Sequence, residues 1–158
     1  MEISLNGSDV ININGTLQRD FADGDVGVLT LPNELVQMKP GKNGNTVIAF
    51  SATGQLGELT LRFIRGSFND QYINAQYRAF VFDPASYVTM EAVVTKQIGD
   101  GNGNITSDSY VLTGGVIQSI PEVKSNVEGD TDQGVTIWKL RFAKVERQIS
   151  SSTVSLAV

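Results

Sequence analysis

The chain contains no cysteine and no histidine among its 158 residues. Without cysteine it can form no disulfide, no thiol nucleophile and no zinc site that uses thiolate ligands. Without histidine it has no Ser-His-Asp or Cys-His arrangement, and the side chain that titrates near neutral pH is missing. Any catalysis would rest on carboxylates, lysine, tyrosine or a metal held by oxygen ligands alone.

Charge is also scarce. The chain has 12 Lys and Arg against 17 Asp and Glu, so its formal net charge is 12 − 17 = −5. An acidic balance argues against a conventional DNA-binding domain, which presents a basic face. No apolar run approaches the roughly 18 residues that a membrane span needs. Residues 1–6 show no secretory signal, so we expect synthesis in the cytoplasm and no contact with a membrane.

The residues that are present favour strands. The chain has 16 glycines but only 4 prolines, which together with many Val, Ile and Thr is typical of strands joined by tight turns. Asn14-Gly15 predicts a two-residue hairpin, and Gly114-Gly115 predicts a bulge within a strand. Strands are expected near 10–17, 26–31, 35–38, 46–52, 57–65, 88–98, 105–120 and 135–145.

One segment interrupts this pattern. At about residues 69–82 there is no glycine or proline, and Asn69 or Asp70 is a suitable helix cap. Its apolar residues recur with helical spacing, at Ile73, Tyr77 and Phe80. We expect a helix that packs its aromatic side on a sheet.

The order of elements predicts a mainly β fold. Several strands, one helix and several more strands make up a two-sheet β-sandwich or barrel with one flanking helix. We expect residues 1–147 to form a single domain. Residues 148–158 are rich in serine and then apolar, and we expect them to form a C-terminal arm.

Motifs that would carry chemistry are incomplete. The segment 100–104 resembles the start of a calcium loop, but Ile105 and Val111 occupy the positions where that loop needs glycine and glutamate. A hairpin tip explains it better. Glu58 and Glu91 are the best candidates for a pair of catalytic carboxylates, yet a solvated strand face explains both. We therefore expect no catalytic, cofactor-binding or metal-binding residue, and a protein that is not an enzyme.

The unusual features are long hairpins, a projecting loop at 35–53 and loose apolar segments at both ends. Exposed strand edges and arms bind other chains by strand pairing. With these features the chain resembles the tail tube proteins of phages, particularly those of small contractile-tailed phages and related prophages. The residues that carry the resemblance span most of the chain in order, at 21–25, 41–45, 57–62, 67–70, 112–117 and 135–147, the last with Trp138.

The resemblance implies a structural virion protein. Copies would form hexameric rings, with inner strands joined into one barrel, and the rings would stack into the hollow tube through which the genome is ejected. The implied partners are other copies of the chain, the tape measure, baseplate and terminator proteins, and a tail sheath if the tail is contractile. The implied location is the virion tail, assembled in the host cytoplasm. The alternative is the tube of a type VI secretion system or of a phage-derived bacteriocin.

Two sets of residues follow from this resemblance. A long loop between early strands contacts the next ring in the family, and the matching residues are Lys39, Pro40, Gly41, Lys42, Asn43, Gly44 and Asn45. Glu58 and Glu91 are candidates for the lumen. Six copies would carry 6 × (−5) = −30 charges, and a lumen of that sign repels the phosphates of DNA, so that the genome slides instead of binding to the wall.

Overall fold

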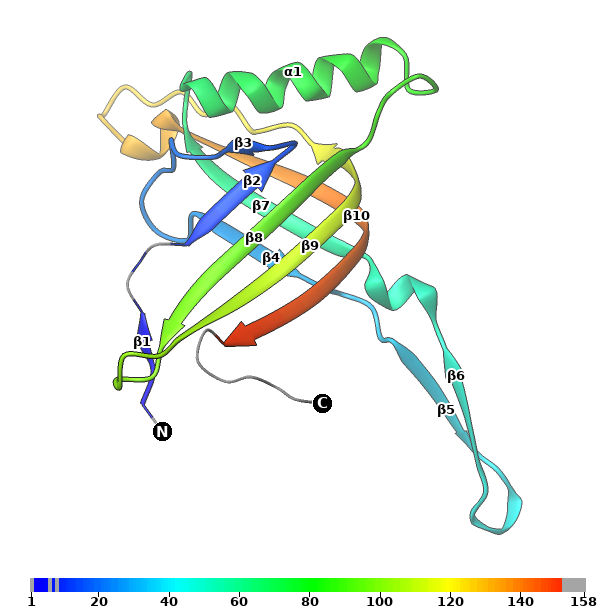
Figure 1. The fold of residues 1–158 in the computed structure, drawn as a ribbon. Coiled ribbons are helices and arrows are strands. Elements are labelled where there is room, and N and C mark those ends of the chain that lie inside the picture. Colours follow the sequence, from blue (N-terminus) through cyan, green and yellow to red (C-terminus); the bar gives the residue numbers. More distant parts are fainter. Residues whose placement is uncertain (1, 6, 8, 152–158) are drawn as a thin grey trace.

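The computed structural model describes residues 2–5, 7 and 9–151. The fold is mainly β and sandwich-like, with a large antiparallel sheet of eight strands, a small sheet of two strands and one helix (Figure 1). The predicted fold class is therefore confirmed. The two layers of the sandwich, however, belong to one strongly bent sheet. The second sheet is a separate hairpin that leaves the body.

Eleven elements make up this fold, with three short 3-10 turns between them. The strands are β1 Ser4–Leu5, β2 Val10–Ile13, β3 Thr16–Leu17, β4 Gly27–Thr30, β5 Val36–Pro40, β6 Thr46–Phe50, β7 Gly57–Ile64, β8 Met90–Gly99, β9 Ile105–Ser119 and β10 Val135–Ser151, and the helix is α1 Phe68–Phe82. The 3-10 turns are η1 Lys42–Gly44, η2 Ala52–Gln55 and η3 Thr131–Gly134. The large sheet has the order β3-β2-β8-β9-β10-β7-β4, and β1 pairs with β8.

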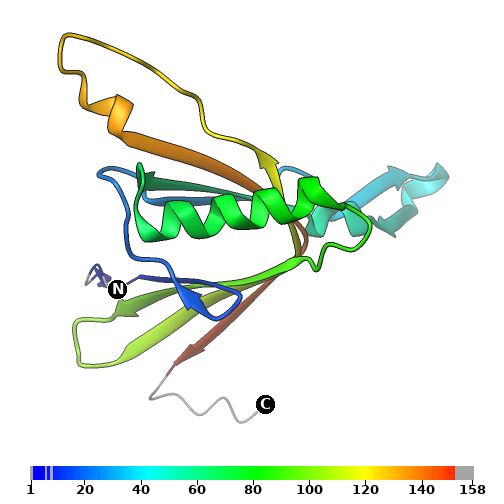
Figure 2. The same cartoon turned by 90° about the horizontal axis from the view of Figure 1, so that it is seen from above.

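The long strands β9 and β10 bend and so contribute to both layers (Figure 2). We call β2, β8, β9 and residues 143–151 of β10 the β8 half, and β4, β7 and residues 135–142 of β10 the β7 half. The core lies between the halves, under α1, and includes Ile13, Leu59, Leu61, Phe63, Ile73, Met90, Leu112, Leu140 and Phe142. Each half thus has one face turned to the core and one turned outward.

The predicted bulge is present in β9. Met90 pairs with Gly115 and Ala92 with Leu112, so two residues of β9 oppose one residue of β8. Gly114 adopts a positive φ of 70°, which suits glycine because it has no Cβ. A bulge increases the local twist of a strand, and this one lies where β9 passes from one layer to the other.

The helix begins one residue earlier than predicted, and its cap differs. Ser67 is the cap residue, and its hydroxyl accepts a hydrogen bond from the backbone N–H of Asp70. Neither Asn69 nor Asp70 serves as the cap, because both side chains bind other parts of the chain. The expected packing is confirmed: Ile73 is fully buried, and the Tyr77 ring lies 6.3 Å from that of Trp138.

The C-terminal strand is longer than predicted. β10 continues to Ser151 and pairs with β9 to its end, with Gln148 opposite Ser109 and Ser151 opposite Thr106. The first four residues of the expected arm, 148–151, are therefore strand, because the partner strand β9 extends far enough to pair with them. The rest of the expected arm, 152–158, lies outside the described residues.

Candidate functional site

The β5–β6 hairpin projects from the body as a two-stranded sheet (Figure 1). All ten of its strand residues are exposed. The cross-strand pairs Val36–Phe50 and Met38–Ile48 share one face, and Phe50 and Met38 expose 67% and 63% of their surface. A two-stranded hairpin alone is at best marginally stable in water, and its apolar face adds a reason for it to pack on something.

The tip of this hairpin holds the residues predicted to contact the next ring, from Lys39 to Asn45. The chain reverses through η1, where Asn43 and Gly44 have φ values of 64° and 81°. The backbone N–H of Gly41 donates to the carbonyl of Asn45 and closes the turn. The tip is thus exposed and well formed, and its contact with another ring stays a prediction.

A tight joint holds the hairpin to the body. The backbone of Gly54 crosses residues 34 and 35 so closely that a Cβ at this position would lie 2.5 Å from the Glu34 carbonyl oxygen. The Asn33 side chain donates to the carbonyl of Thr53 at 3.1 Å, and the Ser51 N–H donates to that of Leu35 at 2.8 Å. These contacts fix the direction in which the hairpin leaves the body.

The large sheet ends in open edges. β10 pairs with β7 over residues 135–142 and with β9 over residues 139–151. Within the described part of the chain, residues 143–151 therefore have no partner strand on the side where β7 has ended. At the other side of the β8 half, the one described strand that covers β2 is the two-residue strand β3. Open edges of this kind accept a strand from another chain.

The outward face of the β8 half is mostly uncharged. Its polar residues are Thr95, Gln97, Ser107, Ser109, Gln148 and Ser150, and Val10, Val93 and Val111 lie on the same face. Thr95 and Ser109 are within hydrogen-bond distance, their hydroxyl oxygens 3.3 Å apart. The charged side chains on this face are Glu91 and the ion pair of Lys144 with Glu146, which sum to 1 − 2 = −1. The face therefore offers almost no cation to a phosphate.

The structure separates the two lumen candidates. Glu58 lies on β7 and Glu91 on β8, with β9 and β10 between them in the sheet. Their neighbours Leu59 and Ala92 face the shared core from the two halves, so the two carboxylates point outward on opposite layers. Glu58 is also ion-paired with Arg141. They do not form a carboxylate pair, and Glu91 alone lies on the face with little charge.

Asp108 has a role that its sequence position did not suggest. Its carboxylate is buried and accepts two hydrogen bonds from Arg147, from Nε at 2.8 Å and from Nη2 at 2.9 Å. The guanidinium lies 5.8 Å from the centre of the Tyr110 ring. The hydrogen bonds to Asp108 raise the pKa of Arg147 further above its usual value. The pair fixes the end of β10 to β9. The sequence alone does not show that Asp108 and Arg147 are neighbours, because this depends on the register of the two strands.

The start of α1 is fixed to the sheet by two polar side chains. Asn69 is buried, and its side-chain oxygen accepts hydrogen bonds from the N–H groups of Arg19 and Asp20 at 2.7 and 3.1 Å. Asp70 Oδ1 accepts from Trp138 Nε1 at 2.8 Å and from the Thr136 hydroxyl at 3.0 Å. These contacts position the helix rather than form a reactive site.

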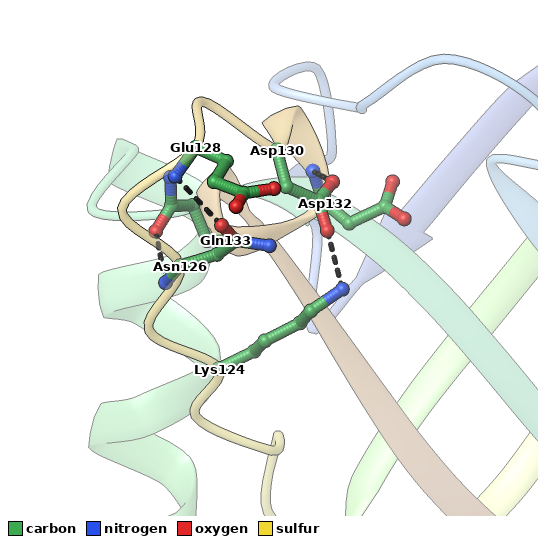
Figure 3. A network of polar contacts seen from close by, with 6 residues as sticks. All are labelled: Lys124, Asn126, Glu128, Asp130, Asp132 and Gln133. Atoms are coloured by element: carbon green, nitrogen blue, oxygen red, sulfur yellow. Dashed lines mark hydrogen bonds and ion pairs between the residues drawn. The ribbon is translucent and has the colours of Figure 1, made fainter.

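The loop at 120–134 is held in one shape by its own polar groups (Figure 3). Lys124 forms an ion pair with Asp130, which raises the pKa of the lysine and lowers that of the carboxyl. The Gln133 side chain accepts a hydrogen bond from the N–H of Asn126 at 3.1 Å. Arg65 anchors the loop to β7 because it donates to the carbonyls of Glu122, Gln133 and Val135.

A cavity of about 570 Å³ lies between this loop and the β7 half, and Arg62, Arg65 and Lys139 line part of it. Arg65 is already engaged with backbone carbonyls, so it is not available to hold an anion. The described residues contain no group of three or more acidic side chains placed to hold a metal ion. None of the helices in that part of the chain is long and apolar enough to cross a membrane.

The described residues offer three surfaces for association. They are the apolar face of the β5–β6 hairpin, the open edge of β10 and the weakly charged face of the β8 half. A comparison with protein-family models and with curated proteins finds no match to this chain.

Proposed function

We propose that this chain is the subunit of a hollow tube, a phage tail tube through which DNA passes. Copies of the chain associate into rings, and the rings stack. The observation that carries this proposal is the combination, in the β8 half, of open edges on both sides with an outward face of mostly uncharged side chains.

The open edges favour ring closure. Residues 143–151 of β10 present backbone groups on one side of the β8 half, and β2 ends the half on the other side behind the two-residue strand β3. A strand of one copy that pairs with the opposite edge of the next copy satisfies both edges. Such pairing repeats with the same geometry at each step, so a closed ring leaves no edge unpaired.

The outward face of the β8 half suits a lumen for DNA. In that closed ring one face of the joined sheet lines the interior, and the core and α1 cover the other face. The charge of this face, −1 in each copy, gives 6 × (−1) = −6 in a ring of six. Protein groups bind DNA mainly by releasing counterions from phosphates, which requires cations. A wall with one lysine per copy, itself paired with Glu146, lets DNA slide.

Electron microscopy of the purified protein tests the proposal. Concentrated samples in negative stain are expected to show rings with a central hole or tubes. Hydrogen exchange gives a second measurement: assembly is expected to slow exchange at those amides of residues 143–151 that are not bonded to β9. Amides of the loop at 125–130 serve as the control and keep their rate. A protein that stays monomeric at every concentration contradicts the proposal.

A further inference from the structure

Four charged residues lie across the β8 half, on the face of the sheet that also bears the core. They are Asp9 just before β2, Lys96 in β8, Asp108 in β9 and Arg147 in β10. Each lies two or four residues from a buried core residue of its own strand, as Arg147 does from Val145. Because side chains alternate along a strand, all four lie on the core face, beyond the end of the core.

The signs of these charges alternate from strand to strand. Asp9 Oδ2 accepts a hydrogen bond from Lys96 Nζ at 2.8 Å. Lys96 lies opposite Asp108 in the register of β8 and β9. Asp108 in turn accepts two hydrogen bonds from Arg147, at 2.8 and 2.9 Å. We call these four residues the charge ladder, and its signs run −, +, −, + from the β2 side to the β10 side.

The ladder ends at the two open edges of the β8 half with opposite charges (Figure 1). The Arg147 side chain is 55% exposed, and within the described residues its Nη1 donates to no acceptor. The Asp9 side chain is 42% exposed, and its Oδ1 accepts from no donor in that part of the chain. β3 covers residues 12 and 13 of β2, and Gln18 donates to the Ile11 carbonyl, so neither reaches Asp9. Each edge therefore presents one charge that can bind a further partner.

We propose that Arg147 of one copy binds Asp9 of the next copy, and that this pair sets the register in which the two copies join. The strands β2, β8, β9 and β10 alternate in direction, so the β2 of the next copy continues the antiparallel order beside β10. On the core face, the neighbours of Arg147 in β10 are Val145 and Ile149. A register shifted along the strand thus leaves Asp9 beside an apolar side chain.

The pair selects the geometry of the junction more than it holds the copies together. Exposed ion pairs contribute little free energy, whereas like charges at an interface are costly and so exclude wrong arrangements. The backbone hydrogen bonds of the joined strands supply the attraction. The inference rests on the proposed tube, and it names the residues by which one copy recognises the next.

Charge exchange between two variants tests this pairing. Asp9→Lys places two cations at the junction, and Arg147→Glu places two carboxylates there. Each variant alone is expected to need about tenfold more protein for assembly, measured by sedimentation. An equal mixture is expected to assemble near the wild-type concentration, because alternating copies bring opposite charges to every junction. Mixing restores no pair with Lys96 or Asp108 inside a copy, so recovery reports contact between copies.

The matched control is Lys144→Glu, which changes a lysine on the opposite face of the same stretch of β10. Mixed with Asp9→Lys, it is expected to leave the Asp9→Lys copies in solution. Recovery with this control, or no recovery in a mixture of folded Asp9→Lys and Arg147→Glu proteins, would overturn the inference. The fluorescence of Trp138 reports whether each variant is folded.

Cross-linking of Arg147→Lys gives a second measurement that needs no reversal of charge. A carbodiimide activates a carboxylate, takes up its oxygen as a urea and leaves an amide bond to a lysine amine in contact with it. Asp9 and position 147 lie at opposite edges of one copy, with β8 and β9 between them, so a 9–147 link forms only between copies. We expect this link in assembled samples, identified by mass spectrometry, and its loss when Asp9→Asn is added.

Microscopy of the same samples separates this inference from the proposed function. Tubes with no 9–147 link and no recovery on mixing overturn the pairing of Arg147 with Asp9 but leave the tube intact. A 9–147 link in open chains with no ring supports the pairing and contradicts the tube. A wild-type protein that never assembles contradicts both.

Discussion

At the scale of single residues, three polar residues at the start of α1 each fix a different part of the structure. Ser67 caps the helix, Asn69 holds the chain at residues 19 and 20, and Asp70 binds β10. The sequence predicts a cap in this segment, but it does not reveal which residue takes that role. The choice depends on Trp138 and Thr136, which are more than 60 positions away. Local propensity cannot report partners so distant.

Replacing Asp70 by alanine is expected to destabilise the protein. The change leaves the Trp138 indole N–H without its acceptor, whereas the Thr136 hydroxyl can still donate to the Phe63 carbonyl and the Gly66 N–H is exposed to solvent. A donor left unsatisfied in a largely buried site costs about 1–3 kcal/mol, and we expect a loss of this size in the free energy of unfolding. Trp138 is the only tryptophan, so its fluorescence during urea denaturation reports the transition. Asp25→Ala, an exposed position, is the control, and an equal effect there would refute this role.

The hydrogen bonds of the Asp100 carboxylate are expected to make the turn between β8 and β9 sensitive to pH. The carboxylate accepts hydrogen bonds from the Asn102 N–H and the Asn104 side chain, and these lower its pKa from 3.8. Because the pKa is lowered, the ionised carboxylate stabilises the turn fully at any pH above the ordinary pKa of an aspartate. This stabilisation is lost as the pH falls through the lowered pKa of Asp100. We expect the amide NMR signals of Asn102 and Asn104 to shift only below pH 3.8. A midpoint above 3.8 would contradict this assignment.

At the scale of elements, the sequence predicts most strands because their apolar and polar residues alternate. β7 is the clearest example, since Leu59, Leu61 and Phe63 are buried and the residues between them are not. The sequence predicts strands near 35–38 and 46–52 within a projecting loop, but it does not predict that these strands pair as a separate two-stranded sheet. The strands of this β5–β6 hairpin lack an alternation that reports burial, because both of their faces are exposed. The sequence predicts too short a β10 for a related reason: Ser150 pairs with β9, but its side chain is exposed and gives no apolar signal.

The joint at the base of the hairpin gives a prediction for this element. Gly54→Ala places a methyl group 2.5 Å from the Glu34 carbonyl oxygen, so the crossing of the two segments must open. Overpacking of this kind costs about 1–3 kcal/mol, which corresponds to a fall of about 2–12 °C in the melting temperature of a chain of this size. The NMR signals of the hairpin amides are expected to move as well.

Gly134→Ala is the matched control for this change. Gly134 has open space where a Cβ would lie, and its φ is not positive. Its replacement is expected to leave both the melting temperature and the hairpin signals unchanged. Equal melting temperatures for the two variants would show that the close approach at Gly54 does not fix the hairpin.

At the scale of the whole molecule, the net charge of −5 matters less than where the charges lie. The sequence indicates an acidic lumen with Glu58 and Glu91. In the structure these carboxylates lie on opposite layers, and the face best suited to a lumen is close to neutral. Cations such as Arg62, Lys139 and Arg141 lie on or beside the β7 half. We therefore attribute the ease with which DNA would pass to the scarcity of cations rather than to acidic repulsion.

The fold class follows from the sequence because the period of two and the single helical segment each persist over many residues. The bending of one sheet into two layers does not, because it depends on pairing between β9 and β10 over long distances in the chain. The open edges also become visible only when the register of every strand is known.

Cryo-electron microscopy of the concentrated protein tests the central claim most directly. We expect stacked rings in which β10 of one copy pairs with the β2 side of the next, and in which Thr95, Ser107 and Ser109 line a hollow centre. A particle that remains monomeric, or a ring whose lumen is lined by the β7 half with Glu58 and Arg141, would contradict the account.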